Sequence, residues 1–185
     1  MATKIQICNM SLRLIGANRI TAITDSVEPA RVLTDVYDMI RDEVLSAHPW
    51  GFAIKRVLLS EDATAPIFNY AHRFTLPVDC LRVIKMEDDD MTFLIEGDYL
   101  VTDEGTAYIK YIAQITDTTI YSPAFITAFA QRLAAEICYP ITNSATKAKA
   151  AYELYLLKKK EAKGISAQEG TAQVIDEDKW EQARS

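Results

Sequence analysis

Four consecutive acidic residues form the most concentrated group of potentially reactive side chains in this sequence: Glu87, Asp88, Asp89 and Asp90. Clustered carboxylates can ligate a divalent cation, but a calcium loop needs alternating ligands, a glycine at its sixth position and a distal glutamate. That spacing is absent here. We therefore interpret the run as a solvated turn between two strands. A metal-dependent enzyme that uses Asp88, Asp89 and Asp90 stays as an alternative hypothesis.

The histidines and cysteines do not fall into a catalytic pattern. His48 precedes a proline at an expected helix end, and His72 lies in an irregular aromatic segment. Cys8, Cys80 and Cys138 are far apart and lack CxxC spacing, so we expect buried thiols rather than disulfides or a zinc site. The phosphate-loop, dinucleotide, serine-elbow and zinc-protease motifs are also absent. We expect a protein that is not an enzyme and that needs no cofactor or metal.

Two groups of side chains could bind nucleic acid. The first is a cluster of lysines: Lys158, Lys159, Lys160 and Lys163. The second is an aromatic stretch: Trp50, Phe52, Phe68, Tyr70 and Phe74. We interpret the lysines as cations that offset the dipole at a helix end, with Gly164 as the C-cap. The aromatic residues have few basic neighbours, so we assign them to core packing and subunit contact. Binding to nucleic acid stays open as an alternative.

Length and composition indicate one folded core. The chain has 185 residues, 49% hydrophobic and 25% charged, which excludes a wholly disordered chain. The apolar runs are shorter than the roughly 20 residues that span a bilayer, and the N-terminus lacks a secretory pattern, so we expect no membrane association. The net charge of −6 disfavours nucleic acid unless a basic patch is assembled locally.

Helical periodicity occurs in four segments, at about 4–16, 27–47, 123–139 and 144–162. Ser26 is the expected N-cap of the second helix, whose charged residues, including Arg41, should face water. The third helix should begin at Pro123, after the N-cap Ser122, and end by Pro140. Asn143 or Ser144 can cap the fourth helix, whose apolar stripe is small and aromatic: Ala145, Ala148, Tyr152, Tyr155 and Leu156.

An inserted β region is expected at about 52–116. Strand-like runs are expected at 53–59 and 81–86. Three further runs, 91–96, 99–102 and 107–115, are separated by the short turn signals Gly97-Asp98 and Asp103-Glu104-Gly105, which predicts a β-meander. Alternation in the last run predicts one buried face with Ile109, Tyr111 and Ala113. Residues 61–74 should be extended and partly irregular.

The expected fold is therefore α+β and mainly α, a bundle of about four helices with an inserted antiparallel β-sheet. We place one domain at 1–163. Residues 164–185 are polar and charged, and we expect them to form an extended C-terminal arm.

Several segments of the sequence resemble the head-to-tail adaptors of short-tailed bacteriophages, the tail tubular protein A family. ICNMSLRLIGANRITAI and EPARVLTDVYDMIRDEVLSAHPWGFA are similar to the opening helix pair of that family, which runs into a tryptophan and a strand. RFTLPVDCLRVIKM looks like the entry to its β region, and FITAFAQRLAAEICYPITNSATKAKAAYELY like its C-terminal helix pair. The resemblance covers about residues 5–160.

This resemblance implies a structural virion protein made in the host cytoplasm. It would form a twelve-subunit ring below the portal, carry the tail nozzle (of the tail tubular protein B type) on the other side, and line the channel through which double-stranded DNA leaves. Tail fibres are a further expected partner. The alternative is a nucleic-acid-binding accessory factor of packaging.

From composition we choose apolar candidates for docking of the arm to the portal: Val174, Ile175 and Trp180. Candidates for contact between subunits are Ala145, Ala148, Tyr152 and Trp50. Small residues on the fourth helix should let a neighbouring helix approach closely.

Overall fold

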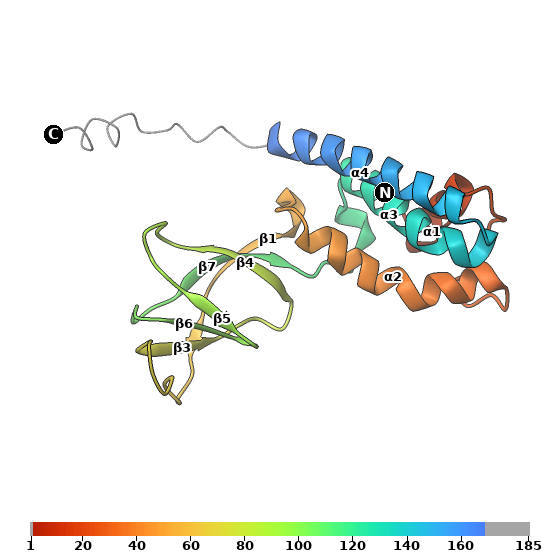
Figure 1. The fold of residues 1–185 in the computed structure, drawn as a ribbon. Helices are drawn as coiled ribbons and strands as arrows, with labels where there is room; N and C mark the ends of the chain where they lie inside the picture. Colours follow the sequence, from red (N-terminus) through yellow and green to blue (C-terminus); the bar gives the residue numbers. More distant parts are fainter. Residues whose placement is uncertain (1, 169–185) are drawn as a thin grey trace.

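The fold is α+β and mainly α, with 47% of residues in helices and 19% in strands, as the sequence predicts. The computed structural model describes residues 2–168. Figure 1 shows the helices gathered at one end and the strands at the other. The chain leaves the helices after α2 and returns to them at α3, so the β region is an insertion.

The bundle has four helices, α1 (Lys4–Leu14), α2 (Glu28–Ser46), α3 (Pro123–Thr142) and α4 (Ala145–Gln168). Helix α3 is the central element, because it contacts α1, α2 and α4. Its buried residues lie on several sides, among them Phe125, Ala128, Ala130 and Ala134. A helix that is apolar around most of its surface must be covered by neighbours, and the other three helices provide that cover.

The start of α2 and the end of α3 differ from the sequence expectations, whereas the start of α4 agrees with them. Val27, rather than Ser26, occupies the N-cap of α2. Helix α3 continues through Pro140 and ends at Asn143, which adopts a left-handed conformation with φ 52°. Pro140 has no amide hydrogen to donate to the Glu136 carbonyl, so the last turn of α3 forms without that hydrogen bond. Ser144 caps α4, since its Oγ accepts from the Lys147 amide at 3.4 Å.

Helix α4 is longer than predicted and runs to Gln168. Gly164 lies inside it, so the prediction that this glycine is the C-cap is wrong. The boundary placed at 163/164 between the domain and the arm is wrong for the same reason. One interior glycine costs a helix only about 1 kcal/mol, too little to stop a helix that is otherwise well supported.

The β region consists of two antiparallel sheets. A proximal sheet has the order β1-β7-β4, and a distal sheet has the order β2-β3-β6-β5. The strands are β1 (Ile54–Leu58), β2 (Ser60–Glu61), β3 (His72–Thr75), β4 (Cys80–Met86), β5 (Leu94–Glu96), β6 (Tyr99–Thr102) and β7 (Tyr108–Ala113). Short 3-10 turns at Gly51–Ala53 and Thr118–Ile120 lead into and out of the region.

The predicted β-meander is wrong. The hairpin β5–β6 is present, with Glu96 opposite Tyr99 across Gly97, whose φ is +60°. Strand β4, however, pairs with β7, and β7 pairs with β1. The predicted buried face of the last strand is confirmed, because Ile109, Tyr111 and Ala113 are all buried, but Ile112 on the opposite face is buried as well. Turn residues determine where the chain reverses locally, but which strands pair depends on burial of their apolar faces.

One continuous core joins the helices to the sheets. Phe125 of α3 lies at its aromatic centre, 5.2 Å from Trp50, 5.1 Å from Phe52 and 4.7 Å from Tyr121 between ring centroids. The indole Nε1 of Trp50 donates to the Val44 carbonyl at 2.9 Å. Because the aromatic rings come from both sides of the insertion, the two regions share this packing.

Arg41 is only 6% exposed, so the expectation that it faces water is wrong. Its guanidinium pairs with Asp38 at 2.6 Å and with Asp42 at 2.8 Å. Asp42 in turn accepts from Gln114 Nε2 at 2.7 Å, which ties α2 to the segment after β7. A charged residue can be buried when it is paired and hydrogen-bonded in this way.

Candidate functional site

The acidic run lies in an exposed turn between β4 and β5. Glu87, Asp88, Asp89 and Asp90 are all exposed. Asp89 pairs with Lys85 at 2.7 Å, and the Asp88 carboxylate accepts from the Asp90 amide at 3.3 Å. Within residues 2–168, His, Cys, Asp and Glu side chains form no group of three or more that could hold a metal ion. The run has the geometry of a solvated turn.

The histidines are in different surroundings and far apart in the fold. His72 Nδ1 lies 2.7 Å from Glu61 Oε1 at the surface of the distal sheet. His48 packs edge-on against Trp50, with ring centroids 4.9 Å apart. Burial, together with Lys163 and Arg82, lowers the pKa of His48. Neither histidine is part of an assembled acid–base group in the described region.

The aromatic stretch does not form a base-stacking platform, because its members are divided between core and surface. Trp50 is 1% exposed and Phe74 is equally well buried, whereas Phe68 is 74% exposed. Trp50 is therefore a core residue, and its choice as a candidate for subunit contact is wrong. Its size and its indole hydrogen bond suit the core better than a surface.

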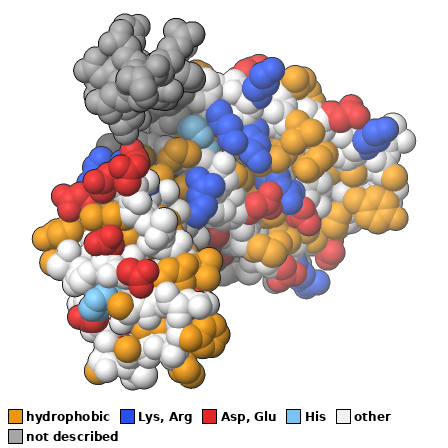
Figure 2. Space-filling model, turned by 60° about the vertical axis from the view of Figure 1, so that its left-hand side comes forward, with side chains coloured by type: hydrophobic (Ala, Val, Ile, Leu, Met, Phe, Trp, Pro, Cys, Tyr) orange, Lys and Arg blue, Asp and Glu red, His pale blue; other side chains and the backbone are white. Residues whose placement is uncertain are grey.

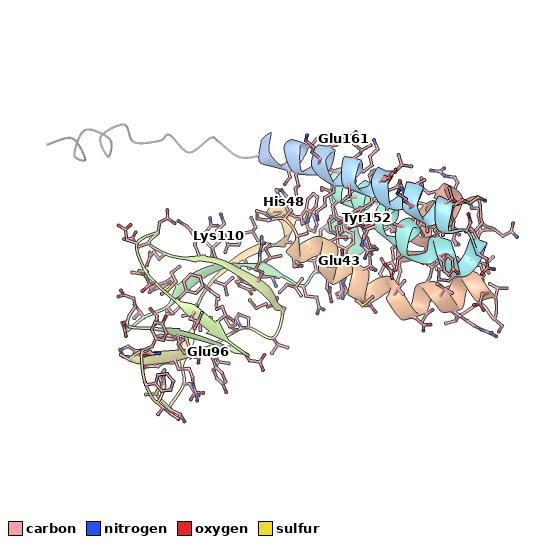
Figure 3. The ribbon with its side chains drawn as sticks, in the orientation of Figure 1. Glu43, His48, Glu96, Lys110, Tyr152 and Glu161 are labelled. Atoms are coloured by element: carbon pink, nitrogen blue, oxygen red, sulfur yellow. The ribbon has the colours of Figure 1, made fainter. Side chains whose placement is uncertain are left out.

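The other candidates for subunit contact lie on α4. Ala145 and Tyr152 are exposed, and Ala148 is half-buried. The side of α4 that packs on α3 carries Ala151, Tyr155 and Ala162. Tyr152, labelled in Figure 3, and Leu156 are each 48% exposed, in contrast to the predicted stripe. The arm candidates Val174, Ile175 and Trp180 lie outside the described residues.

Helix α4 exposes large apolar side chains on more than one side. Leu154, Leu157 and Ile165 follow one another at spacings of three and eight residues, which places them on one side of the helix. Tyr152 and Leu156 lie on another side. These exposed apolar side chains make α4 a candidate interaction surface.

A groove of about 520 Å³ lies beside this apolar surface, between α3 and α4. Pro123 and Ala124 contribute its α3 wall, and Ala162 and Ile165 contribute its α4 wall. Lys158 and Glu161, paired at 2.7 Å, form a polar rim. We call this feature the α3–α4 groove; it can accept apolar side chains.

The lysine cluster does not cap the end of α4, because the last turn of the helix carries no basic residue. Lys158 pairs with Glu161, and Lys159 Nζ lies 5.6 Å from the Tyr155 ring centroid. Burial, followed by the charges of Lys159 and Arg82, lowers the pKa of Lys163. The lysines are therefore distributed around the helix, and they give α4 as a whole a positive charge.

Charge is divided between two regions of the molecule. Helix α4 carries six lysines and two glutamates, whereas residues 60–75 and 94–104 of the distal sheet and its loops carry six carboxylates and one arginine. Figure 2 shows most of the visible basic side chains over the helical part, with acidic ones among them, and further acidic side chains over the part formed by the strands. The two regions are complementary in sign.

The loop between β2 and β3, residues 62–71, presents a second apolar feature, and we call it the distal loop. Ile67 is 97% exposed and is followed by the exposed Phe68. Figure 1 places this loop at the end of the β region that lies away from α4. Sequence reasoning missed it, although Pro66 and Asn69 are turn residues that can hold an apolar pair at a loop tip.

The base of the distal loop is held by several hydrogen bonds. The Asp62 carboxylate accepts from the Thr64 amide at 2.8 Å and from Arg73 at 2.7 Å. These bonds hold the pKa of Asp62 below its usual value. The Ala71 amide donates to Asp103 at 3.0 Å on the other side of the loop. The exposed tip is therefore presented on a fixed base.

Among the described residues, no helix has the length and apolar composition that a membrane crossing requires. Comparison with protein-family models and with curated proteins gave no match to this chain.

Proposed function

We propose that this chain is a structural subunit, the head-to-tail adaptor of a tailed bacteriophage. In this proposal it forms a ring below the portal, carries the tail nozzle and lines the channel through which DNA leaves the capsid. The observation that carries the proposal is the apolar surface of α4, which the described fold leaves uncovered. A subunit of a larger assembly needs such a surface, and a monomeric enzyme does not.

The form of the molecule supports the same proposal. The helices and sheets lie at opposite ends and share a continuous core, so the subunit is an elongated body. An elongated subunit with an interaction surface on its helices can contact a neighbour while its sheets reach another layer of the assembly. The sequence segments that resemble the adaptor family extend over both the helical bundle and the β region.

The net charge of −6 also suits a DNA conduit. Each contact that a channel wall makes with a phosphate must be broken again as the duplex moves through. A ring with an overall negative charge limits such contacts, while the lysines of α4 remain available for contacts between proteins.

The experiment that tests the proposal measures the mass of portal rings after mixing with this protein. The full chain is compared with a version that ends at Gln168, which keeps all of α4. We expect the full chain to load onto portals as a closed multimer and the shortened chain to load less. The unfolding transitions of the two chains are the control for folding. If the full chain does not bind portals, the adaptor proposal is wrong.

A second candidate function is a nucleic-acid-binding accessory factor of packaging. It is favoured by Lys149, Lys160 and Lys163, whose spacing places them on one side of α4. Binding of duplex DNA that weakens as salt rises, and that is lost in the triple Lys→Glu variant of these residues, would support it. No binding at low salt would remove it.

A further inference from the structure

We propose that the distal loop of one copy of this chain inserts Ile67 and Phe68 into the α3–α4 groove of the next copy. The inference rests on the proposed function, because it specifies how the ring would be built. It pairs the exposed loop tip with the apolar groove on the described molecule.

The loop tip and the walls of the α3–α4 groove are both apolar. Ile67 and Phe68 project from the loop, whereas the groove is walled by Pro123, Ala124 and Ile165. Leu154 and Leu157 extend the groove's apolar surface along α4. An aromatic side chain that enters a pocket and loses its water is the usual centre of a protein interface.

The distal loop is held in one conformation by hydrogen bonds. Asp62 receives hydrogen bonds from Thr64 and Arg73, and Asp103 receives one from Ala71. Asn69 adopts a left-handed conformation, with φ +71°, directly after the exposed pair. A loop that is already held in one shape loses less conformational entropy on binding, so more of the contact energy appears as affinity.

The two surfaces lie in regions of opposite charge. The distal loop and its sheet are strongly acidic, and α4 is strongly basic. Glu61 and Asp62 lie at the base of the loop, and the groove lies on the basic helix α4, with the Lys158–Glu161 pair on its rim. Opposite charges around an apolar centre favour the approach of these two surfaces and disfavour contact of either surface with itself.

The geometry then gives a head-to-tail arrangement. The loop lies at the far end of the β region and the groove lies on the helical bundle, so each copy offers both surfaces without pairing them internally (Figure 1). Contacts between two different surfaces propagate from copy to copy and form a ring when the rotation closes. A second copy is the occupant that both surfaces specify.

The first test measures self-association of the full chain by sedimentation at low salt, where the attraction between the charged surfaces is least screened. We expect Phe68→Lys and Ile165→Glu each to weaken association by about tenfold or more, as expected for central interface residues. The matched controls are Val78→Lys and Leu14→Glu, which replace exposed apolar residues elsewhere. The controls should associate like the unchanged protein.

The second test mixes the two deficient variants. Phe68→Lys keeps an intact groove, and Ile165→Glu keeps an intact loop, so each mixed pair has one functional contact. We expect the mixture to form dimers and no larger species. All four altered residues are exposed, and unchanged unfolding transitions should show that every variant is folded.

Three outcomes would overturn the contact. Association that is unaffected by either variant would place the interface elsewhere, and a mixture that stays monomeric would exclude pairing of loop with groove. An unchanged chain that is monomeric at every concentration would also exclude it. Loading onto portals is measured separately, so an adaptor assembled through other surfaces would still be recognised.

Discussion

Helices α2 and α4 are both long and both lie on α3, yet they use their apolar residues differently. Helix α2 turns one face to the core, with Leu33, Ile40 and Leu45 fully buried. Helix α4 gives mainly Ala151, Tyr155 and Ala162 to the core and leaves its leucines exposed. In α2 most of the apolar surface is buried within the chain, with Met39 as an exception, whereas in α4 the leucines are exposed in the described structure.

The comparison separates residues that stabilise the subunit from residues that are free for assembly. Equal side chains on the two helices should therefore have unequal effects on the free energy of unfolding.

Leu33→Ala on α2 should destabilise the free protein by about 2–5 kcal/mol, because it removes buried methyl groups and leaves a cavity. Leu157→Ala on α4, where the side chain is 59% exposed, should change stability by about 0.5 kcal/mol or less. Urea unfolding of both variants measures the difference. Similar losses in the two variants would show that α4 is as well packed as α2.

Trp50→Phe should destabilise by about 1–3 kcal/mol, because the Val44 carbonyl loses its indole donor inside the core. Tyr152→Phe on α4 is the matched control, since that side chain is exposed and the substitution should be nearly neutral. Both variants are compared by urea unfolding at one pH. A neutral Trp50→Phe would mean that the hydrogen bond at the end of α2 adds nothing to stability.

Asp79 provides the smallest effect, at the sheet edge next to the helices. Burial alone would raise its pKa, but hydrogen bonds from Lys55 and Tyr111 outweigh burial and lower it below 3.8. The ionised form therefore adds stability above that value, and the contribution is lost as the pH falls through the lowered pKa. Because the pair is partly exposed, we expect only about 0.5 kcal/mol.

The measurement for Asp79 is the free energy of unfolding of the protein and of Asp79→Asn between neutral and acidic pH. The variant should be less stable at neutral pH, and the difference should shrink as the carboxylate is protonated. A difference that is constant with pH would assign the effect to packing.

Local periodicity was sufficient to predict the helices, because a stripe such as Leu33, Tyr37, Ile40 and Val44 depends only on spacing along one segment. Strand pairing was not predictable in this way. The partner of β4 is β7, more than twenty residues away in sequence, and this choice depends on burial of the sheet as a whole. Strand β3 was likewise not predicted, because it lies in a segment that is rich in turn residues.

The surfaces were harder to predict than the fold. Tyr152 was recognised as a surface candidate, but Trp50 was assigned to the same class although it is a core residue. Exposed and buried apolar residues have the same composition, so a single sequence cannot separate them. The prediction for Arg41 was wrong in the opposite sense: Arg41 was expected to be exposed, but its carboxylate partners permit burial of its charge.

The most direct test of the difference between α2 and α4 is hydroxyl-radical footprinting of the free protein and of the protein assembled on portals. We predict that oxidation of Tyr152, Leu154 and Leu157 falls on assembly, while Met39, exposed on α2, stays reactive. Unchanged oxidation of the α4 side chains in the assembled state would contradict the account, because the apolar surface of α4 would then have no partner.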